Sequence, residues 1–354
     1  MSFFENLFHH KKRAAESVVL IDIGASSVAG AYARYLEGGP TELLYSRRLP
    51  IEIRKDETHG RAMLRALDIL GNDLVREGAP VLARVVGKGN VDVVLVSIDA
   101  PWQETKVHTE RFEQKEPFVF TKSLITKRLE EVNAAPPDKT LVDESIIGTI
   151  LNGYGTRSPY GKKAHRASVI VLTSLIERQI ANSIISALES LYHTKRVIPI
   201  AGSSLRYQAI RDIFPHERDA LILDATGRSL TSISLVRKGN FVDLIHVSTP
   251  SDDGAWVPTI TSELADLAKR YPLPRTIFLL TRESETSALR QKLDAANFAS
   301  LWLSANPPKI IPVSRNHVAG SIKQTAATPP DIVLLFMTLY YEYRHRALNE
   351  PGFE

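Results

Sequence analysis

The chain has 354 residues, of which 44% are hydrophobic and 24% charged, and its formal net charge is +4. This length predicts two or more subdomains. The absence of cysteine excludes disulfides, thiolate chemistry and cysteine-based zinc sites. Basic residues are dispersed, which argues against a nucleic-acid-binding protein. No apolar run is long enough to span a bilayer and no secretory signal is found, so we expect an intracellular protein.

The first 16 residues are predicted to form a separate tail. Apolar side chains fall on one face of a short helix and a basic cluster follows; the residues are Phe3, Phe4, Leu7 and Phe8, then Lys11, Lys12 and Arg13. This pattern is typical of an anchor at a membrane surface or of a helix that docks into a partner. A disordered or self-packed tail is the alternative.

A strand, a small-residue turn and a second strand follow. The apolar run from Val18 ends in Asp22, the turn contains Gly24, Ala25, Ser26 and Ser27, and a second extended run covers 28–35. The elements predicted next by apolar periodicity are a strand at 41–53, a helix at 58–77 that ends at Gly78-Ala79-Pro80, strands at 91–98, 102–112, 145–152 and 167–174, helices at 121–133 and 174–192, and a short strand at 196–200.

The same design returns about two hundred residues later. An apolar run ends in Asp224, the turn contains Thr226 and Gly227, and Thr231 lies in the second extended run. Backbone N–H groups in such turns converge on phosphates, and an aspartate at a strand end binds Mg²⁺ through water. An ordinary hairpin with an aspartate-capped turn is the alternative. The duplication favours the phosphate-binding interpretation.

The remaining elements predicted are a strand at 240–248, a helix at 257–270, strands at 276–280 and 309–313, a helix at 284–293 and a helix at 328–345. We expect the last helix to close the second subdomain. P-loop, H-E-x-x-H and G-x-S-x-G motifs do not occur in the sequence.

Asp22-Ile23-Gly24-Ala25-Ser26-Ser27 resembles the first phosphate motif of the actin-like ATPase superfamily. Asp224-Ala225-Thr226-Gly227 with Thr231 is similar to its second phosphate motif. Within the superfamily, the chain resembles the bacterial FtsA/PilM branch. The resemblance implies an α/β, two-lobed actin-like fold (duplicated and ribonuclease-H-like) with an inserted small α+β subdomain of the SHS2 type. It divides the chain into 17–90 (first half), 91–200 (insertion and return to the first lobe) and 201–350 (second half).

The resemblance also implies ATP and Mg²⁺ as ligands. The two phosphate motifs and Gly254 would bind the nucleotide, and Asp22 and Asp224 would hold the metal through water. Two departures leave this open. Arg282 and Glu283 stand where the superfamily has paired glycines against the adenine. The stretch 199–204 offers no carboxylate to orient an attacking water, so the chain is at most a weak ATPase.

The function implied is that of a scaffold at the cytoplasmic face of the inner membrane. A PilM-type protein would assemble type IV pilus machinery, and the absence of a long linker to a C-terminal membrane-targeting helix favours it. An FtsA-like division protein that tethers a tubulin-like polymer stays open, because Asn152-Gly153-Tyr154 resembles that branch. Two further alternatives also stay open. One is a nucleotide-free pseudo-ATPase scaffold, and the other, from a contrasting class, is a sugar-kinase-type phosphotransferase. The partners implied are proteins of a pilus or division complex, a membrane surface and further copies of the chain.

Overall fold

The computed structural model describes residues 15–36, 39–132, 135–156, 158–227, 229–248, 254–296, 298, 301–302, 306–325 and 329–347. The N-terminal residues predicted to contact a membrane or partner lie outside the described residues; they are Phe3, Phe4, Leu7, Phe8, Lys11, Lys12 and Arg13.

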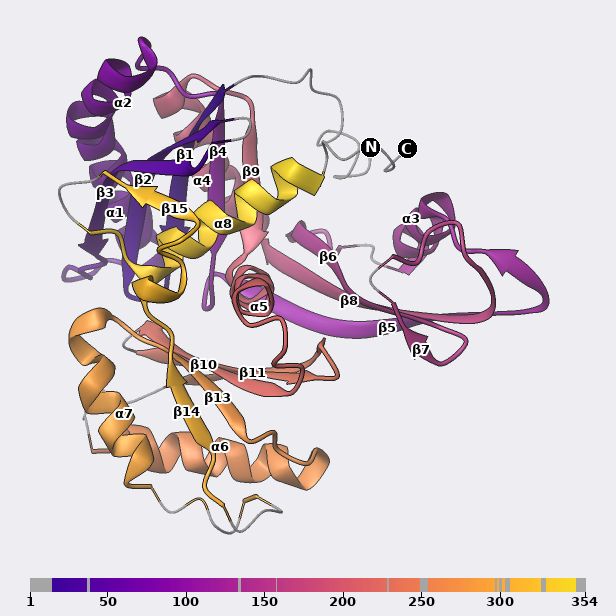
Figure 1. Cartoon of the computed structure of the whole chain (residues 1–354). Coiled ribbons are helices and arrows are strands. Elements are labelled where there is room, and N and C mark those ends of the chain that lie inside the picture. The colour runs from indigo at the N-terminus through magenta and orange to yellow at the C-terminus, as the bar shows by residue number, and fades with distance from the viewer. Residues whose placement is uncertain are drawn as a thin grey trace.

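Two sheets with corresponding strand orders form the body of the molecule, and the first sheet has one additional edge strand, β15 (Figure 1). The first has the order β15-β3-β2-β1-β4-β9; its strands are β1 (Ala15–Ile23), β2 (Ser27–Leu36), β3 (Thr41–Pro50), β4 (Val93–Ile98), β9 (Val197–Ala201) and β15 (Ile322–Gln324). The second has the order β12-β11-β10-β13-β14; its strands are β10 (Ala220–Gly227), β11 (Leu230–Arg237), β12 (Asn240–Ser248), β13 (Thr276–Leu280) and β14 (Lys309–Pro312).

The two sheets repeat one topology. A hairpin, β1–β2 or β10–β11, is extended by a third antiparallel strand on one side. On the other side, two strands run parallel to the first strand of the hairpin. The duplicated α/β architecture, which the resemblance implied, is therefore confirmed.

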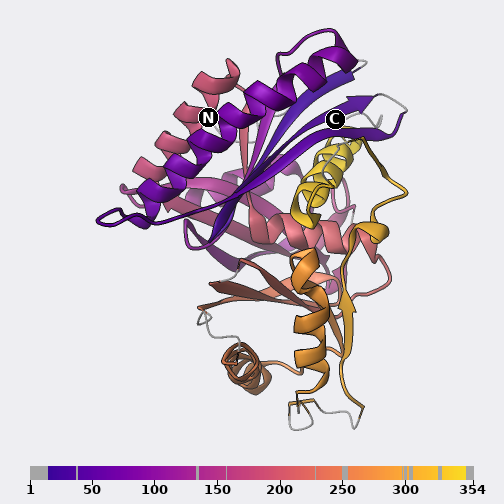
Figure 2. The same cartoon turned by 90° about the vertical axis from the view of Figure 1, so that its left-hand side faces the viewer.

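Helices cover both faces of the first sheet. Successive side chains of β1 point to opposite faces, and since most of them are apolar, both faces must be buried. Val19 and Ile21 pack with α1 (His59–Asp73) and α4 (Arg178–Tyr192). Val18 and Leu20 pack in the cluster that contains α8 (Ile332–Ala347) and part of α5 (Gly202–Ile213). Figure 2 shows α1 and α8 on opposite sides of the strands.

Two helix predictions were wrong. The first helix does not end at Gly78-Ala79-Pro80. It continues through a π-helical turn, η2 (Leu74–Gly78), into α2 (Ala79–Val86), because Pro80 falls in the first turn of α2, where its missing N–H is not needed. The last helix covers the first sheet instead of closing the second lobe. Its run from Val333 to Met337 is buried throughout, which requires apolar neighbours on all sides.

The second sheet carries α6 (Trp256–Arg270) and α7 (Thr286–Asp294) in one cluster with the outward face of β10. Short helical turns, η3 (Glu283–Glu285) and η4 (Arg315–His317), lie beside them. Helix α5 connects the lobes, because Leu205 and Ile210 share a cluster with Leu20 of the first sheet and Ile222 of the second. This position brings the polar side of α5 to the junction of the two hairpins.

A smaller subdomain projects from the first lobe between β4 and β9 (Figure 1). It is an antiparallel sheet of order β5-β8-β6-β7 with one helix; the elements are β5 (Gln103–Val119), α3 (Lys122–Val132), β6 (Lys139–Leu151), β7 (Tyr154–Gly155) and β8 (Lys163–Glu177). Its own core contains Phe120, Ile125, Leu129 and Val171. The chain then returns to the first sheet through α4 and β9. An α+β insertion is therefore present, and its assignment to the SHS2 type stays a prediction.

Candidate interlobe site

The two small-residue turns meet at the junction of the lobes. In the first, the Gly24 amide donates to the Ser27 carbonyl at 3.0 Å. In the second, a bulge follows Asp224, and the Thr226 amide donates to the Asp224 carboxylate at 2.9 Å. A β-carbon built on Gly227 would lie 3.4 Å from the β-carbon of Ala25. The turns therefore face each other across the cleft with room for about one methyl group between these two residues.

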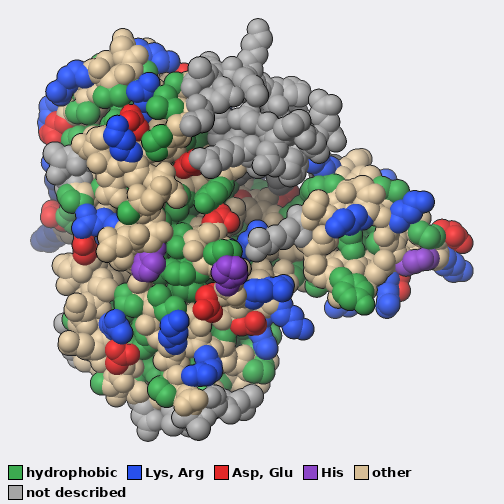
Figure 3. Space-filling view, in the orientation of Figure 1, with side chains coloured by type: hydrophobic (Ala, Val, Ile, Leu, Met, Phe, Trp, Pro, Cys, Tyr) green, Lys and Arg blue, Asp and Glu red, His purple; other side chains and the backbone are tan. Residues whose placement is uncertain are grey.

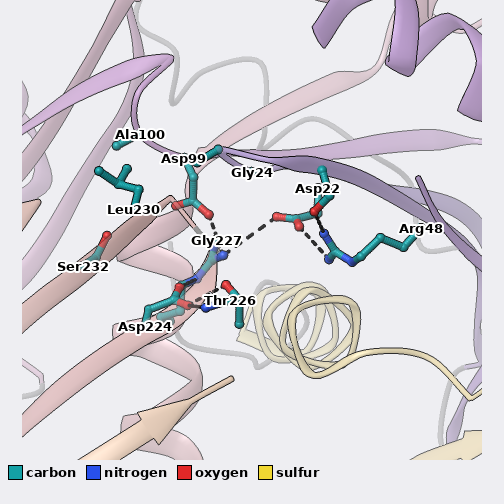
Figure 4. Close-up of a pocket in the computed structure, with 13 residues that line it drawn as sticks. Asp22, Gly24, Arg48, Asp99, Ala100, Asp224, Thr226, Gly227, Leu230 and Ser232 are labelled. Carbon is teal, nitrogen blue, oxygen red and sulfur yellow. Dashed lines mark hydrogen bonds and ion pairs between the residues drawn. The ribbon is translucent and has the colours of Figure 1, made fainter. Parts of the chain in front are cut away.

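Three aspartates converge on one guanidinium between the turns (Figure 4). Asp22 ends β1, Asp99 follows β4 and Asp224 lies on β10. Arg206 of α5 places Nη2 2.5 Å from Asp99 Oδ2 and Nε 2.5 Å from Asp224 Oδ2, and Nη2 lies 3.9 Å from Asp22 Oδ1. Arg206 is only 4% exposed and Asp22 2%. One buried cation thus joins carboxylates of both lobes.

Arg48 of β3 neutralises the other side of Asp22. Its Nη2 donates to Asp22 Oδ2 at 2.9 Å, its Nη1 to the Ser27 hydroxyl at 2.8 Å and its Nε to Asp331 Oδ2 at 2.7 Å. The other oxygen of Asp331 accepts the Val333 and Leu334 amides at the start of α8. The first phosphate-like turn is therefore connected to the N-terminus of α8.

Arg282 crosses the cleft at its outer side. Its Nε donates to the Thr226 carbonyl at 3.1 Å and its Nη2 to the Ser26 hydroxyl at 3.2 Å. Glu283 pairs with Arg315 at 2.7 Å instead. Arg282 thus binds both turns at once.

Burial dominates the electrostatics of this cluster. It raises the pKa of Asp99 to about 7; Arg206 opposes this shift, and the neighbouring charges of Asp22 and Asp224 add to it. Burial by itself would lower the pKa of Arg206, but the carboxylates of Asp99, Asp224 and Asp22 raise it above its ordinary value. Arg206 therefore stays charged at any ordinary pH, whereas Asp99 titrates near neutrality.

ATP with Mg²⁺ does not fit this arrangement of residues. The cavity among Asp22, Asp99, Asp224 and the two turns measures about 20 Å³, which is room for about one water molecule. Arg206 fills the space between the carboxylates where a divalent cation would lie. Within the described part of the chain, no three His, Cys, Asp or Glu side chains are placed to hold a metal ion. The nucleotide and metal sites stay predictions, and binding would require the lobes to open.

Most of the predicted phosphate-site residues are brought together. The residues that line the cavity are Asp22, Gly24, Ala25, Ser27, Asp224, Thr226 and Gly227. Ser26 adjoins it through Arg282. Thr231 is buried on β11, where it accepts a hydrogen bond from Trp256 Nε1 at 3.0 Å, and it does not line the cavity. Gly254 precedes α6 and does not line it either.

Sequence reasoning missed Arg48, Asp99, Arg206 and Asp331. The sequence contains a signal for two of them, Asp99 and Arg206. Asp99 directly follows a strand whose six residues are all buried. Arg206 stands next to Leu205 and Tyr207, in a helix turn that is otherwise small or apolar. A charged residue in such a turn needs a buried counter-charge.

No protein-family model and no curated protein sequence matches the chain. Solved structures do match. The PilM–PilN type IV pilus biogenesis complex is 13% identical, with 94% of this chain and 99% of that chain covered and a TM-score of 0.52. A Bacteroides thetaiotaomicron protein with an actin-like ATPase fold and unknown function is 8% identical, with 96% of this chain and 99% of that chain covered and a TM-score of 0.48. A third match is the cytoplasmic domain of EpsL, an inner membrane component of the type II secretion system of Vibrio cholerae. It is 10% identical, with 96% of this chain and 100% of that chain covered and a TM-score of 0.39.

The chain is a two-lobed α/β protein with the actin-like fold, as predicted. The likeness to the chain of the PilM–PilN complex extends over nearly the whole of both chains and concerns the fold. In the described part of the chain, no helix combines the length and the apolar character needed to cross a membrane.

Proposed function

We propose that this chain is an assembly scaffold of the PilM type, acting at the cytoplasmic face of the inner membrane in a pilus- or secretion-type machine. The likeness of fold to a chain of the PilM–PilN complex supports the proposal. So does the nature of the interlobe site, which contains structural ion pairs rather than a set of groups placed for phosphoryl transfer.

The observation that carries the proposal is the arginine clamp, by which we mean Arg206 and Arg282 bridging the two turns. In an actin-like ATPase, nucleotide and metal would join the lobes. Here a buried guanidinium joins Asp99 of the first lobe to Asp224 of the second. A scaffold of this kind keeps its closed conformation without ATP, which corresponds to the nucleotide-free alternative predicted from Arg282 and Glu283.

The partners we propose are proteins of the same membrane machine. The N-terminal segment, with Phe3, Phe4, Leu7 and Phe8 before the basic cluster Lys11, Lys12 and Arg13, would add a weak membrane contact.

Deletion of the gene in its host tests the function. We expect loss of surface pili, counted by electron microscopy, or loss of protein secretion, and recovery when the chain is supplied in trans. Filamentous cells with normal pili and secretion would identify the FtsA-like alternative instead. A fluorescent fusion should mark the cell periphery, and should do so less well when residues 1–13 are removed. Normal pili, secretion and division in the deletion strain would refute a scaffold of either kind.

A further inference from the structure

A second and larger cavity, of about 440 Å³, lies between the projecting subdomain and the second lobe. The subdomain supplies β6, β7 and the loop that carries Tyr160. The second lobe supplies the β11–β12 turn, and the chain from the end of α5 to Arg218 completes the wall. This volume is within the range of about 300–1,000 Å³ found for ligand sites.

The charge of this cavity is positive. Its lining includes Arg211, Arg218 and Lys238 against one carboxylate, Glu217, which accepts a hydrogen bond from the Thr276 hydroxyl at 3.1 Å. Within the described chain none of the three cations forms an ion pair. Lys and Arg side chains gather on the second lobe beside the projecting subdomain (Figure 3). A polar cavity lined by three cations and one carboxylate has an excess of positive charge, which favours an anionic occupant.

The two arginines are already oriented. Arg211 donates to the Tyr207 hydroxyl oxygen at 3.2 Å, and its guanidinium carbon lies 5.6 Å from the centroid of that ring. Arg218 Nη2 donates to the Lys238 carbonyl at 2.9 Å. Side chains fixed in this way lose little conformational entropy when they bind a ligand.

The wall of the cavity on the side of the subdomain is fixed and carries an exposed tyrosine. Strand β7 pairs with β6 only at Ile150 and Leu151. Residues 146–148 of β6 line the cavity. The Ile147 carbonyl accepts a hydrogen bond from the Tyr207 hydroxyl at 3.1 Å, and Gly148 faces the side chain of Asn240, so this wall is fixed in place by the second lobe and α5. Tyr160, 37% exposed, lines the same cavity, and tyrosine and arginine are enriched where proteins bind each other.

We propose that this cavity binds an acidic, extended segment of a partner protein, an inference that rests on the proposed scaffold function. The carboxylates of the segment face Arg211, Arg218 and Lys238, and its other side chains pack against Tyr160.

Fluorescence anisotropy with a labelled Glu- and Asp-rich peptide tests this, with a Gln- and Asn-rich peptide for comparison. The test variant is Arg211→Gln with Lys238→Asn. Gln retains a donor for the Tyr207 hydroxyl, and Asn tolerates the left-handed backbone of Lys238, whose φ is 52°. The matched control, Arg84→Gln with Lys195→Asn, removes two exposed charges from the first lobe. We expect saturable, salt-sensitive binding of the acidic peptide, about five- to tenfold weaker in the test variant and unchanged in the control.

Each contrary result overturns the proposal. These results are no saturable binding, an equal loss in both pairs of substitutions, and displacement of the peptide by inorganic pyrophosphate at lower concentrations than by unlabelled peptide, which would assign the cavity to a small anion. The scaffold function is judged separately by the deletion strain. A deletion phenotype without peptide binding would support the scaffold function and refute peptide binding in this cavity. Peptide binding without a deletion phenotype would support the binding site and refute the scaffold function.

Discussion

Gly227 faces Ala25 across the two lobes, and a β-carbon built on Gly227 would lie 3.4 Å from the β-carbon of Ala25. Each residue belongs to one copy of the repeated turn. The turns that would hold phosphates from two sides thus leave room for about one methyl group between these residues, and the arginine clamp neutralises the aspartates beside them. The closed state is therefore explained by the chain's own side chains.

Arg206 should be a main determinant of stability. Arg206→Met leaves Asp99 and Asp224 without their shared cation, and breaking a buried pair costs about 3–5 kcal/mol. Arg206→Lys keeps the charge but cannot make the forked contacts, so its loss should be smaller. Urea unfolding of both variants measures this. A loss below about 1 kcal/mol for Arg206→Met would mean that the clamp is not what joins the lobes.

Asp99 should make stability depend on pH. Its pKa is raised to about 7 in the folded protein, from 3.8. A carboxyl group with a raised pKa contributes stability that is fully present below its unfolded pKa and is lost as the pH rises through the folded pKa. Asp99→Asn cannot lose a proton, so the stability of the wild type relative to this variant should fall between about pH 4 and pH 7, on the order of 2–4 kcal/mol. Equal pH profiles of urea unfolding would contradict this.

How much of this site could be predicted depends on how far its parts are apart in the sequence. The hairpins at Asp22 and Asp224 are local patterns, so their strands and turns followed from periodicity and small residues, and the resemblance of their motifs implied the duplicated fold. Arg206 and Asp99 are more than one hundred residues apart. Their pairing depends on α5 lying between the sheets, which no local pattern encodes. Arg282 was recognised only as a departure from the superfamily, because its contact with Ser26 bridges residues of different lobes.

The wild type should not bind ATP with Mg²⁺ in saturable fashion at millimolar concentrations, because Arg206 lies between the aspartates and the cavity between the turns measures only about 20 Å³. Isothermal titration calorimetry measures this, with Asp22→Ala plus Asp224→Ala as the control. Saturable binding that is lost in the double variant would confirm the nucleotide prediction and refute a clamp that excludes ATP. Heat that is the same for both proteins would indicate binding elsewhere.

Gly148 should control how the projecting subdomain packs on the second lobe. A β-carbon at this position would overlap the side-chain amide of Asn240, with Cγ at 3.0 Å. Gly148→Ala should therefore destabilise the protein by about 1–3 kcal/mol through overpacking. Asn240→Ala in the same chain should restore most of this loss by removing the amide. Gly155→Ala is the matched control in the same subdomain, since nothing lies within 4 Å of its β-carbon position. Urea unfolding of the wild type, Gly148→Ala, Asn240→Ala and the double variant completes a double-mutant cycle, with Gly155→Ala beside it as the control. A loss that Asn240→Ala does not restore would show that the contact is not the cause.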